Sequence, residues 1–222
     1  MSVFPWSFSA IKTFEQCPKK YFHMKVEKDY NDKPGEAALY GTMVHEAAEL
    51  RVKDGTPIPK KFGYMEPIVD RLLSIKGDKY PELELAVIRS DDDFSPCDFK
   101  DEAAYYRGIA DLVVVNGKKA YCFDYKTGKN SRYADMRQLD LMAGALFCLF
   151  PEVETIKSAL LFVVSNDLID KTHTRDKMLK YLTTFDKRVA DLEDCVDNGI
   201  WNPKSGPLCG WCPVKECAHW RP

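Results

Sequence analysis

The fold is decided by residues 108–128, GIADLVVVNGKKAYCFDYKTG. Two runs rich in β-branched and aromatic residues, 104–115 and 119–126, flank Asn116-Gly117, and an Asn-Gly pair between two such runs is the strongest local signal for a β-hairpin. With these two residues as the turn, Asp111 faces Cys122, and Asp124 is the diagonal neighbour of Asp111. Because side chains alternate along a strand, Asp111, Asp124 and Lys126 share one face of the hairpin.

This face places two carboxylates and an ammonium group on an otherwise apolar hairpin. Buried charges are costly unless they are paired or bind a metal ion. A divalent cation relieves the repulsion between Asp111 and Asp124, and Mg²⁺ prefers one or two carboxylates together with water and phosphate oxygens. Lys126 would then orient the attacking water or neutralise charge. The alternative is a solvent-exposed ion pair between Asp124 and Lys126, which the apolar flanking residues on both faces disfavour.

Outward from the hairpin, the sequence alternates between helix and strand patterns. A helix over 9–28 is interrupted at Pro18, which lacks a backbone donor, and a loop follows at 29–37. The remaining expected elements are helices 41–53, 63–75, 132–149 and 171–198, and strands 83–89, 104–115, 119–126 and 157–165. This order predicts an α/β fold in which antiparallel strands and a crossover to a further strand form a mixed sheet flanked by helices.

Composition limits the class of protein. The chain has 222 residues, enough for one well-buried core, and 45% of them are hydrophobic. No apolar run approaches the length of a membrane span and no signal peptide is recognisable at the start, so a cytoplasmic protein is expected. The formal net charge of −2 gives no general attraction for nucleic acid. Substrate phosphates are therefore assigned to a local basic patch of Lys129, Arg132 and Arg137.

Eight cysteines are many for an intracellular chain, and four of them form a pattern. Cys209, Cys212 and Cys217 are spaced so that their thiolates can surround one metal centre, with Cys17 from the first helix as the fourth ligand. This ligation would clamp the tail from residue 199 onward to the first helix. Zinc and an iron–sulfur cluster both remain open, and His219 is close enough in sequence to replace Cys17 in a zinc site.

Here the sequence resembles a known family. GIAD (108–111) followed by FDYKTG (123–128) resembles the signature of the PD-(D/E)XK nucleases, and within them the RecB-type branch that includes the CRISPR-associated exonucleases. The resemblance extends to three more segments: SFSAIKTFEQCPKKYF (7–22), GTMVHE (41–46) and RQLDLMA (137–143). One departure is Met142, which stands where the family has a tyrosine.

The resemblance implies a restriction-endonuclease-like fold with a cysteine-rich iron–sulfur segment at its C-terminal end. It implies catalytic roles for Asp111, Asp124, Lys126 and Gln138. The implied ligands of Mg²⁺ or Mn²⁺ are His45, Asp111, Asp124 and the backbone carbonyl of Tyr125. The implied ligands of a 4Fe-4S cluster, preferred over zinc, are Cys17, Cys209, Cys212 and Cys217. Glu82 and Glu84 could supply a further acidic ligand or a second metal site, but charges at a strand edge are the preferred interpretation.

The expected organisation is a single nuclease domain over 1–222. Within it, 83–198 form the nuclease core, and 1–28 with 199–222 form the cluster-binding subregion. The expected function is DNA phosphodiester hydrolysis by an exonuclease acting on single-stranded ends in recombination, repair or replication. A helicase, recombinase or replication protein is the expected partner, since no helicase motif is present. The alternatives are an inactive nucleic-acid-binding or assembly protein on a nuclease scaffold, and a zinc-stabilised regulator.

Overall fold

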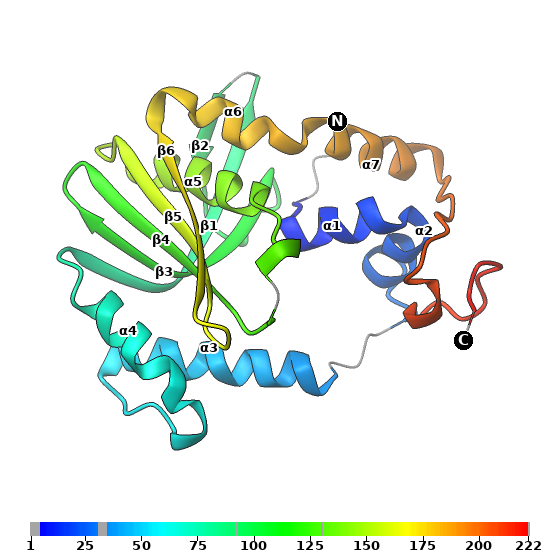
Figure 1. Ribbon diagram of the computed structural model, residues 1–222. Helices are drawn as coiled ribbons and strands as arrows, with labels where there is room; N and C mark the ends of the chain where they lie inside the picture. Colours follow the sequence, from blue (N-terminus) through cyan, green and yellow to red (C-terminus); the bar gives the residue numbers. More distant parts are fainter. Residues whose placement is uncertain (1–4, 31–34, 92, 130, 222) are drawn as a thin grey trace.

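The computed structural model describes residues 5–30, 35–91, 93–129 and 131–221. A six-stranded sheet with the strand order β2-β1-β3-β4-β5-β6 forms its centre (Figure 1). The strands are β1 (Asp78–Ser90), β2 (Asp93–Pro96), β3 (Tyr106–Asn116), β4 (Lys119–Lys126), β5 (Thr155–Phe162) and β6 (Asp167–Thr174). The α-helices are α1 (Phe8–Gln16), α2 (Pro18–Tyr21), α3 (Glu36–Asp54), α4 (Glu66–Leu73), α5 (Arg137–Leu149), α6 (Met178–Leu182) and α7 (Asp186–Asn198).

The sheet is mixed, as the order of elements predicts. Neighbouring strands are antiparallel except β4 and β5, which are parallel and are connected through α5. A parallel pair requires such a crossover because the chain must return to the same end of the sheet. The predicted α/β architecture with flanking helices is therefore confirmed.

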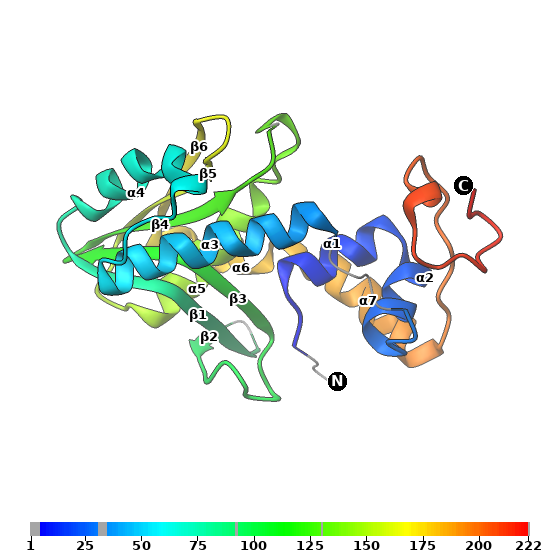
Figure 2. The same cartoon turned by 90° about the horizontal axis from the view of Figure 1, so that it is seen from below.

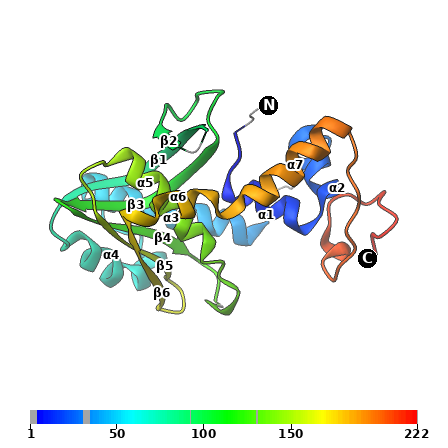
Figure 3. The same ribbon diagram turned by 90° about the horizontal axis from the view of Figure 1, so that it is seen from above.

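Helices cover both faces of the sheet. On one face α3 and α4 pack through Val44 and Val69 against Leu112 of β3 and Leu161 of β5. On the other face α5 packs against the alternate residues of the same strands, and α6 packs on α5 (Figures 1 and 3). Strands β3 and β4 are buried on both faces, which explains why their sequences are almost continuously apolar.

The first helix breaks where the sequence predicts. Ser7 caps α1 by accepting a hydrogen bond from the backbone N–H of Ala10, and Cys17 is extended, with φ −165° and ψ 115°, before α2 begins at Pro18. A π-helical turn, Phe22–Val26, completes this segment. Together α1, α2, α7 and the C-terminal tail extend beyond one end of the sheet (Figures 1 and 2).

The predicted hairpin register is wrong by two residues. Asn116 belongs to the ladder and pairs with Lys119, so the turn consists of Gly117 and Lys118. Gly117 has a φ of 56°, and glycine in the first central position is what a type II′ turn requires. A shift of two residues keeps the alternation, but the alternation of β3 itself breaks at Asp111, because Ala110 and Val113 both belong to the core on the α5 side whereas Leu112 belongs to the core on the α3 side. The shift brings Asp124 opposite Asp111, a position that the expected register gave to Cys122.

Other boundaries also differ from the expectations. The predicted helix 171–198 begins as β6 and becomes helical only from Arg175, and β2 has no predicted counterpart. In β6 only His173 is buried, as befits an edge strand, so no apolar alternation marks it in the sequence. Helix α5 begins at Arg137 rather than 132, after a 3₁₀ turn at Ser131–Tyr133. The remaining 3₁₀ turns are Lys60–Met65, which precedes α4, Arg175–Lys177, Thr183–Phe185 and Cys209–Trp211.

Among the described residues, no helix is long and apolar enough to cross a membrane.

Candidate active site

Asp111 and Asp124 occupy the point at which the pairing of β3 with β4 ends. The last paired residues are Leu112 and Phe123, so the two aspartates stand at the next step of the ladder. Here the backbone N–H of Tyr125 donates to Oδ2 of Asp111 at 2.5 Å. A carboxylate thus takes the place of a backbone acceptor, and both aspartates are buried, with 7% and 4% of their surface exposed.

Lys126 and Gln138 hold the carboxylate of Asp124. Nζ of Lys126 lies 2.5 Å from Oδ2 of Asp124, and Nε2 of Gln138 donates to Oδ1 at 2.6 Å. Nζ of Lys126 also donates to Oε1 of Gln138 at 3.2 Å, which closes a triangle of three side chains from β4 and α5. The contact between Asp124 and Lys126 lacks hydrogen-bond geometry, so Oδ2 of Asp124 remains a buried oxygen without a hydrogen bond among the described residues.

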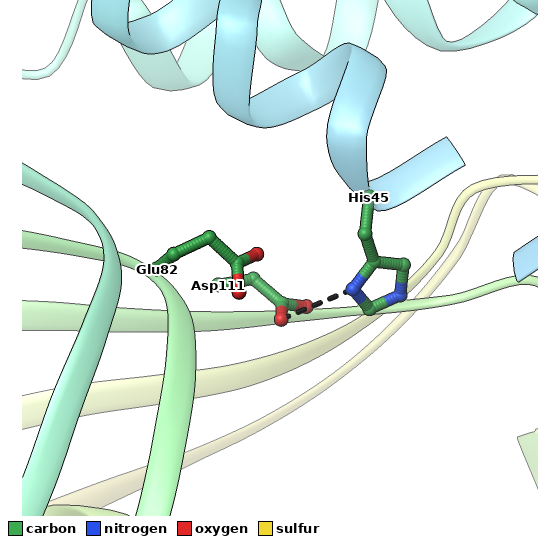
Figure 4. A group of neighbouring side chains, drawn as sticks. All are labelled: His45, Glu82 and Asp111. Atoms are coloured by element: carbon green, nitrogen blue, oxygen red, sulfur yellow. Dashed lines mark hydrogen bonds and ion pairs between the residues drawn. The ribbon is translucent and has the colours of Figure 1, made fainter. Parts of the chain in front are cut away.

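His45 reaches Asp111 from α3. Its Nδ1 lies 3.2 Å from Oδ1 of Asp111, and its ring stands edge-on to that of Tyr125. Glu82 of β1 completes this group: one ligand atom each from His45, Glu82 and Asp111 lie within 4.8 Å of one another (Figure 4). An imidazole and two carboxylates at this spacing form a donor set that divalent cations bind.

Glu82 is the residue of this group for which the sequence favours a charge at a strand edge over a further acidic ligand. The interpretation of Glu84 as an exposed charge agrees with the structure, but Glu82 points toward Asp111. The backbone of Glu82 is left-handed, with a φ of 46°, which is unusual for a residue with a side chain. Such strain concentrates at functional sites. Pro81 pairs with Leu112 and Leu83 pairs with Ala110, so Glu82 lies next to Asp111 across the two strands. Only this register identifies Glu82 as a site residue.

The carboxylates at this site repel one another. Burial and the charge of Asp111 raise the pKa of Glu82 to about 7, although His45 opposes the shift. Burial and Asp111 also raise the pKa of Asp124 to about 6 against the opposing charge of Lys126. Burial alone would lower the pKa of His45, but its hydrogen bond to Asp111 and the surrounding negative charge raise it. A bound cation would remove this repulsion, so the residues present fit a divalent metal.

Of the other residues predicted for the site, Tyr125 is buried, whereas the three basic residues assigned to substrate phosphates lie nearer the surface. The phenol of Tyr125 is buried on the α3 side of the sheet, and its backbone N–H serves Asp111. The guanidinium of Arg137 is engaged by Glu15 and Asp135, so a phosphate would have to compete with two carboxylates. Lys129 is exposed, and so is Arg132, which has an interaction partner of its own. Their roles in substrate binding stay predictions.

The four cysteines of the predicted cluster converge. Cys17, Cys209, Cys212 and Cys217 all line one cavity of about 260 Å³ between α1, α2 and the C-terminal tail, and His219 lines it too. Two of the sulfur atoms accept backbone hydrogen bonds at 3.3 Å, Cys17 from Lys204 and Cys209 from Gly206. The tail is held to the first helices by stacking of Trp201 on Tyr21, with ring centroids 6.0 Å apart.

The chain is similar to known proteins in sequence and in fold. Residues 5–217 match the model of the PD-(D/E)XK nuclease superfamily. A solved structure from Eubacterium rectale, named "Putative exonuclease", is 15% identical with a TM-score of 0.52, and the match covers 95% of this chain and 87% of that one. The crystal structure of SSO0001 is 11% identical with a TM-score of 0.49, covering 98% and 88%. No curated protein matches the chain.

Proposed function

Because the chain belongs to the PD-(D/E)XK nuclease superfamily, we propose that it is a metal-dependent deoxyribonuclease of the RecB-type branch. It acts as an exonuclease on single-stranded DNA ends during recombination, repair or replication, and a helicase, recombinase or replication protein supplies the substrate. The observation that carries this proposal is the convergence of His45, Glu82, Asp111, Asp124 and Lys126 where β3 and β4 part.

The proposed reaction is hydrolysis of a phosphodiester. Mg²⁺ or Mn²⁺ held by His45, Glu82, Asp111 and Asp124 supplies Lewis-acid stabilisation of the negative charge on the transferring phosphoryl group. Lys126 holds its ammonium group beside Asp124, where it orients the attacking water and neutralises developing charge. Gln138 fixes the rotamers of both Asp124 and Lys126, because its amide donates to one and accepts from the other. The backbone carbonyl of Tyr125 is a further proposed ligand.

The same proposal assigns a 4Fe-4S cluster to the four cysteines. The cavity between their sulfur atoms and the backbone donors to Cys17 and Cys209 suit a cluster, whose sulfur ligands commonly accept such hydrogen bonds. In the described chain only the His45 group has its ligand atoms close enough together to share one metal ion. The preference for a cluster over zinc rests on the resemblance of the segment around Cys17 to the iron–sulfur nucleases.

The test is a panel of labelled substrates incubated with the purified protein and Mn²⁺. We expect linear single-stranded DNA to be degraded from an end, while circular single-stranded DNA, duplex DNA and RNA of the same sequence stay largely intact. Chelation of the metal should stop the reaction. A protein that leaves every substrate whole but retains them in a gel-shift assay would be the inactive binding protein instead. Iron and acid-labile sulfide measured on the same sample distinguish the cluster from zinc.

A further inference from the structure

A groove of about 810 Å³ runs from Lys126 and Gln138 along the start of β3. Its other wall is the segment that leads into α1, which lies beside β3 because Trp6 forms an isolated parallel bridge with Tyr106 (Figure 2). We call it the N-terminal groove. The proposed catalytic residues lie at one end of it, and Trp6, Phe99 and Arg107 lie toward the other.

The charge of this groove is one-sided. Three cations line it, Lys12, Arg107 and Lys126, and none of the described residues that line it is acidic. The hollow beside His45, on the α3 side, has the opposite character, because Glu46, Glu49 and Glu82 line it. The candidate site therefore has an acidic side suited to a metal ion and a basic side suited to an anion.

Arg107 is the cation of the groove that still lacks a counter-ion. Lys12 contacts Glu15 and Asp135, and Lys126 contacts Asp124. Within the described chain Arg107 forms no ion pair with a carboxylate. Two contacts orient its guanidinium. Nη2 donates to the backbone carbonyl of Asp101 at 2.5 Å, and Cζ lies 5.8 Å from the centroid of the Phe99 ring. It is thus a fixed positive charge without a neutralising partner.

Two donors at the groove also lack acceptors. Nε1 of Trp6 and Nε of Arg107 are buried atoms without a hydrogen-bond partner among the described residues, and Trp6 is only 2% exposed. A buried donor without an acceptor is unfavourable, but both atoms are shielded from solvent and therefore from a ligand in the groove. A ligand in the groove would meet the terminal nitrogens of Arg107, and the ligand that matches an unneutralised guanidinium is a phosphate.

We propose that the N-terminal groove binds the sugar–phosphate backbone of the strand being cut, with the guanidinium of Arg107 donating to a phosphate beside the scissile one. This inference rests on the proposed function and adds to it a path for the substrate. Arg107 lies four residues before Asp111 on the same face of β3, or roughly 13 Å away. The half-buried ring of Phe99 also lines the groove, and an aromatic side chain there can stack with a base, which favours a single strand over a duplex.

The test measures binding of a fluorescent single-stranded oligonucleotide by anisotropy, with every protein carrying Asp124→Asn so that cleavage does not interfere. Arg107→Gln keeps a donor for the carbonyl of Asp101 but removes the charge. We expect about tenfold weaker binding and a salt dependence reduced by about one phosphate contact. The matched control, Arg71→Gln on the exposed face of α4, should leave the affinity and its salt dependence unchanged.

A second measurement does not depend on the stability of the Arg107 variant. A strand substituted with 5-bromodeoxyuridine is photo-cross-linked to the Asp124→Asn protein, and the cross-linked peptides are identified by mass spectrometry. Cross-links within 5–12 or 98–109 support the groove. Cross-links found only elsewhere overturn it, as does a folded Arg107→Gln protein that binds like the control. If the protein with Asp124 intact neither binds nor cleaves any strand, the proposed function itself is wrong.

Discussion

Glu82 lies opposite Asp111 across the pairing of β1 with β3, and Asp124 lies opposite Asp111 across the pairing of β3 with β4. Three carboxylates on three neighbouring strands therefore meet in one row across the sheet. The imidazole of His45 on α3 and the ammonium group of Lys126 on β4 lie beside this row. Because the three carboxylates are neighbours and are shielded from water, their negative charges repel one another.

Removal of the Glu82 charge should weaken metal binding. With Glu82→Gln, we expect the affinity for Mn²⁺ to fall about tenfold or more, because one ligand is lost, while the metal-free protein becomes more stable. Isothermal titration calorimetry and thermal melting with a chelator measure the two effects. The control is Glu84→Gln, an exposed carboxylate of the same strand. Equal behaviour of the two variants would remove Glu82 from the site.

The stability of the metal-free protein should depend on pH between about 4 and 7. The pKa values of Asp124 (about 6) and Glu82 (about 7) are raised in the folded state, so their contribution to stability is complete below their unfolded pKa values and is lost as the pH rises through the folded ones. Metal affinity should increase over the same range, since binding displaces protons. Urea unfolding in a chelator compares the wild type with Glu82→Gln, whose curve should be flatter. Parallel curves would contradict this explanation.

The sequence predicts the main features of the fold and part of the site, and the reasons lie in particular residues. The hairpin of β3 and β4 is marked by strong β-formers around a glycine, but the exact turn depends on φ at Gly117, which spacing does not reveal. The edge strand β6 is mostly exposed and resembles the helix that follows it in polarity. Glu82 joins the site only through the register of β1, a long-range pairing that no local pattern encodes.

Gln138 should act by positioning Asp124 and Lys126. Gln138→Ala removes the donor to Oδ1 of Asp124, so we expect the turnover rate to fall about tenfold or more with little change in KM. The pH at which activity is half-maximal should also rise, because Asp124 loses a hydrogen bond that favours its charged form. Asn198→Ala, an exposed amide at the end of α7, is the control. A lower rate with an unchanged pH profile would indicate a role other than positioning.

Arg175 should be important for stability because it donates hydrogen bonds to backbone carbonyls at and just after the C-terminal end of α5. Its guanidinium donates to the backbone carbonyls of Phe147, Phe150 and Val153 at 2.6–3.0 Å. Arg175→Ala leaves these carbonyls without this donor, and we expect the free energy of unfolding to fall by about 3 kcal/mol. Urea denaturation measures the loss, with Lys187→Ala on the surface of α7 as the control. A loss below about 1 kcal/mol would mean that water replaces the guanidinium.

The cluster prediction concerns the tail. Cys17→Ser should abolish iron binding and lower the melting temperature, because the tail would lose its covalent tie to the first helices. Cys195→Ser, on α7 and away from the cavity, should retain iron. Iron content and thermal melting are measured on anaerobically purified protein. Full iron content in the Cys17 variant would exclude Cys17 as a ligand.

We propose that Asp111, Asp124 and Lys126 form the hydrolytic centre of this nuclease-superfamily protein. The most direct measurement is the single-turnover rate of cleavage of single-stranded DNA in Mn²⁺ by wild type, Asp124→Asn, Lys126→Met and Asp170→Asn, the last an exposed aspartate on β6 of the same sheet. We predict losses of at least about a hundredfold for the two site variants and a wild-type rate for Asp170→Asn. Cleavage by Asp124→Asn and Lys126→Met at the wild-type rate would contradict the account.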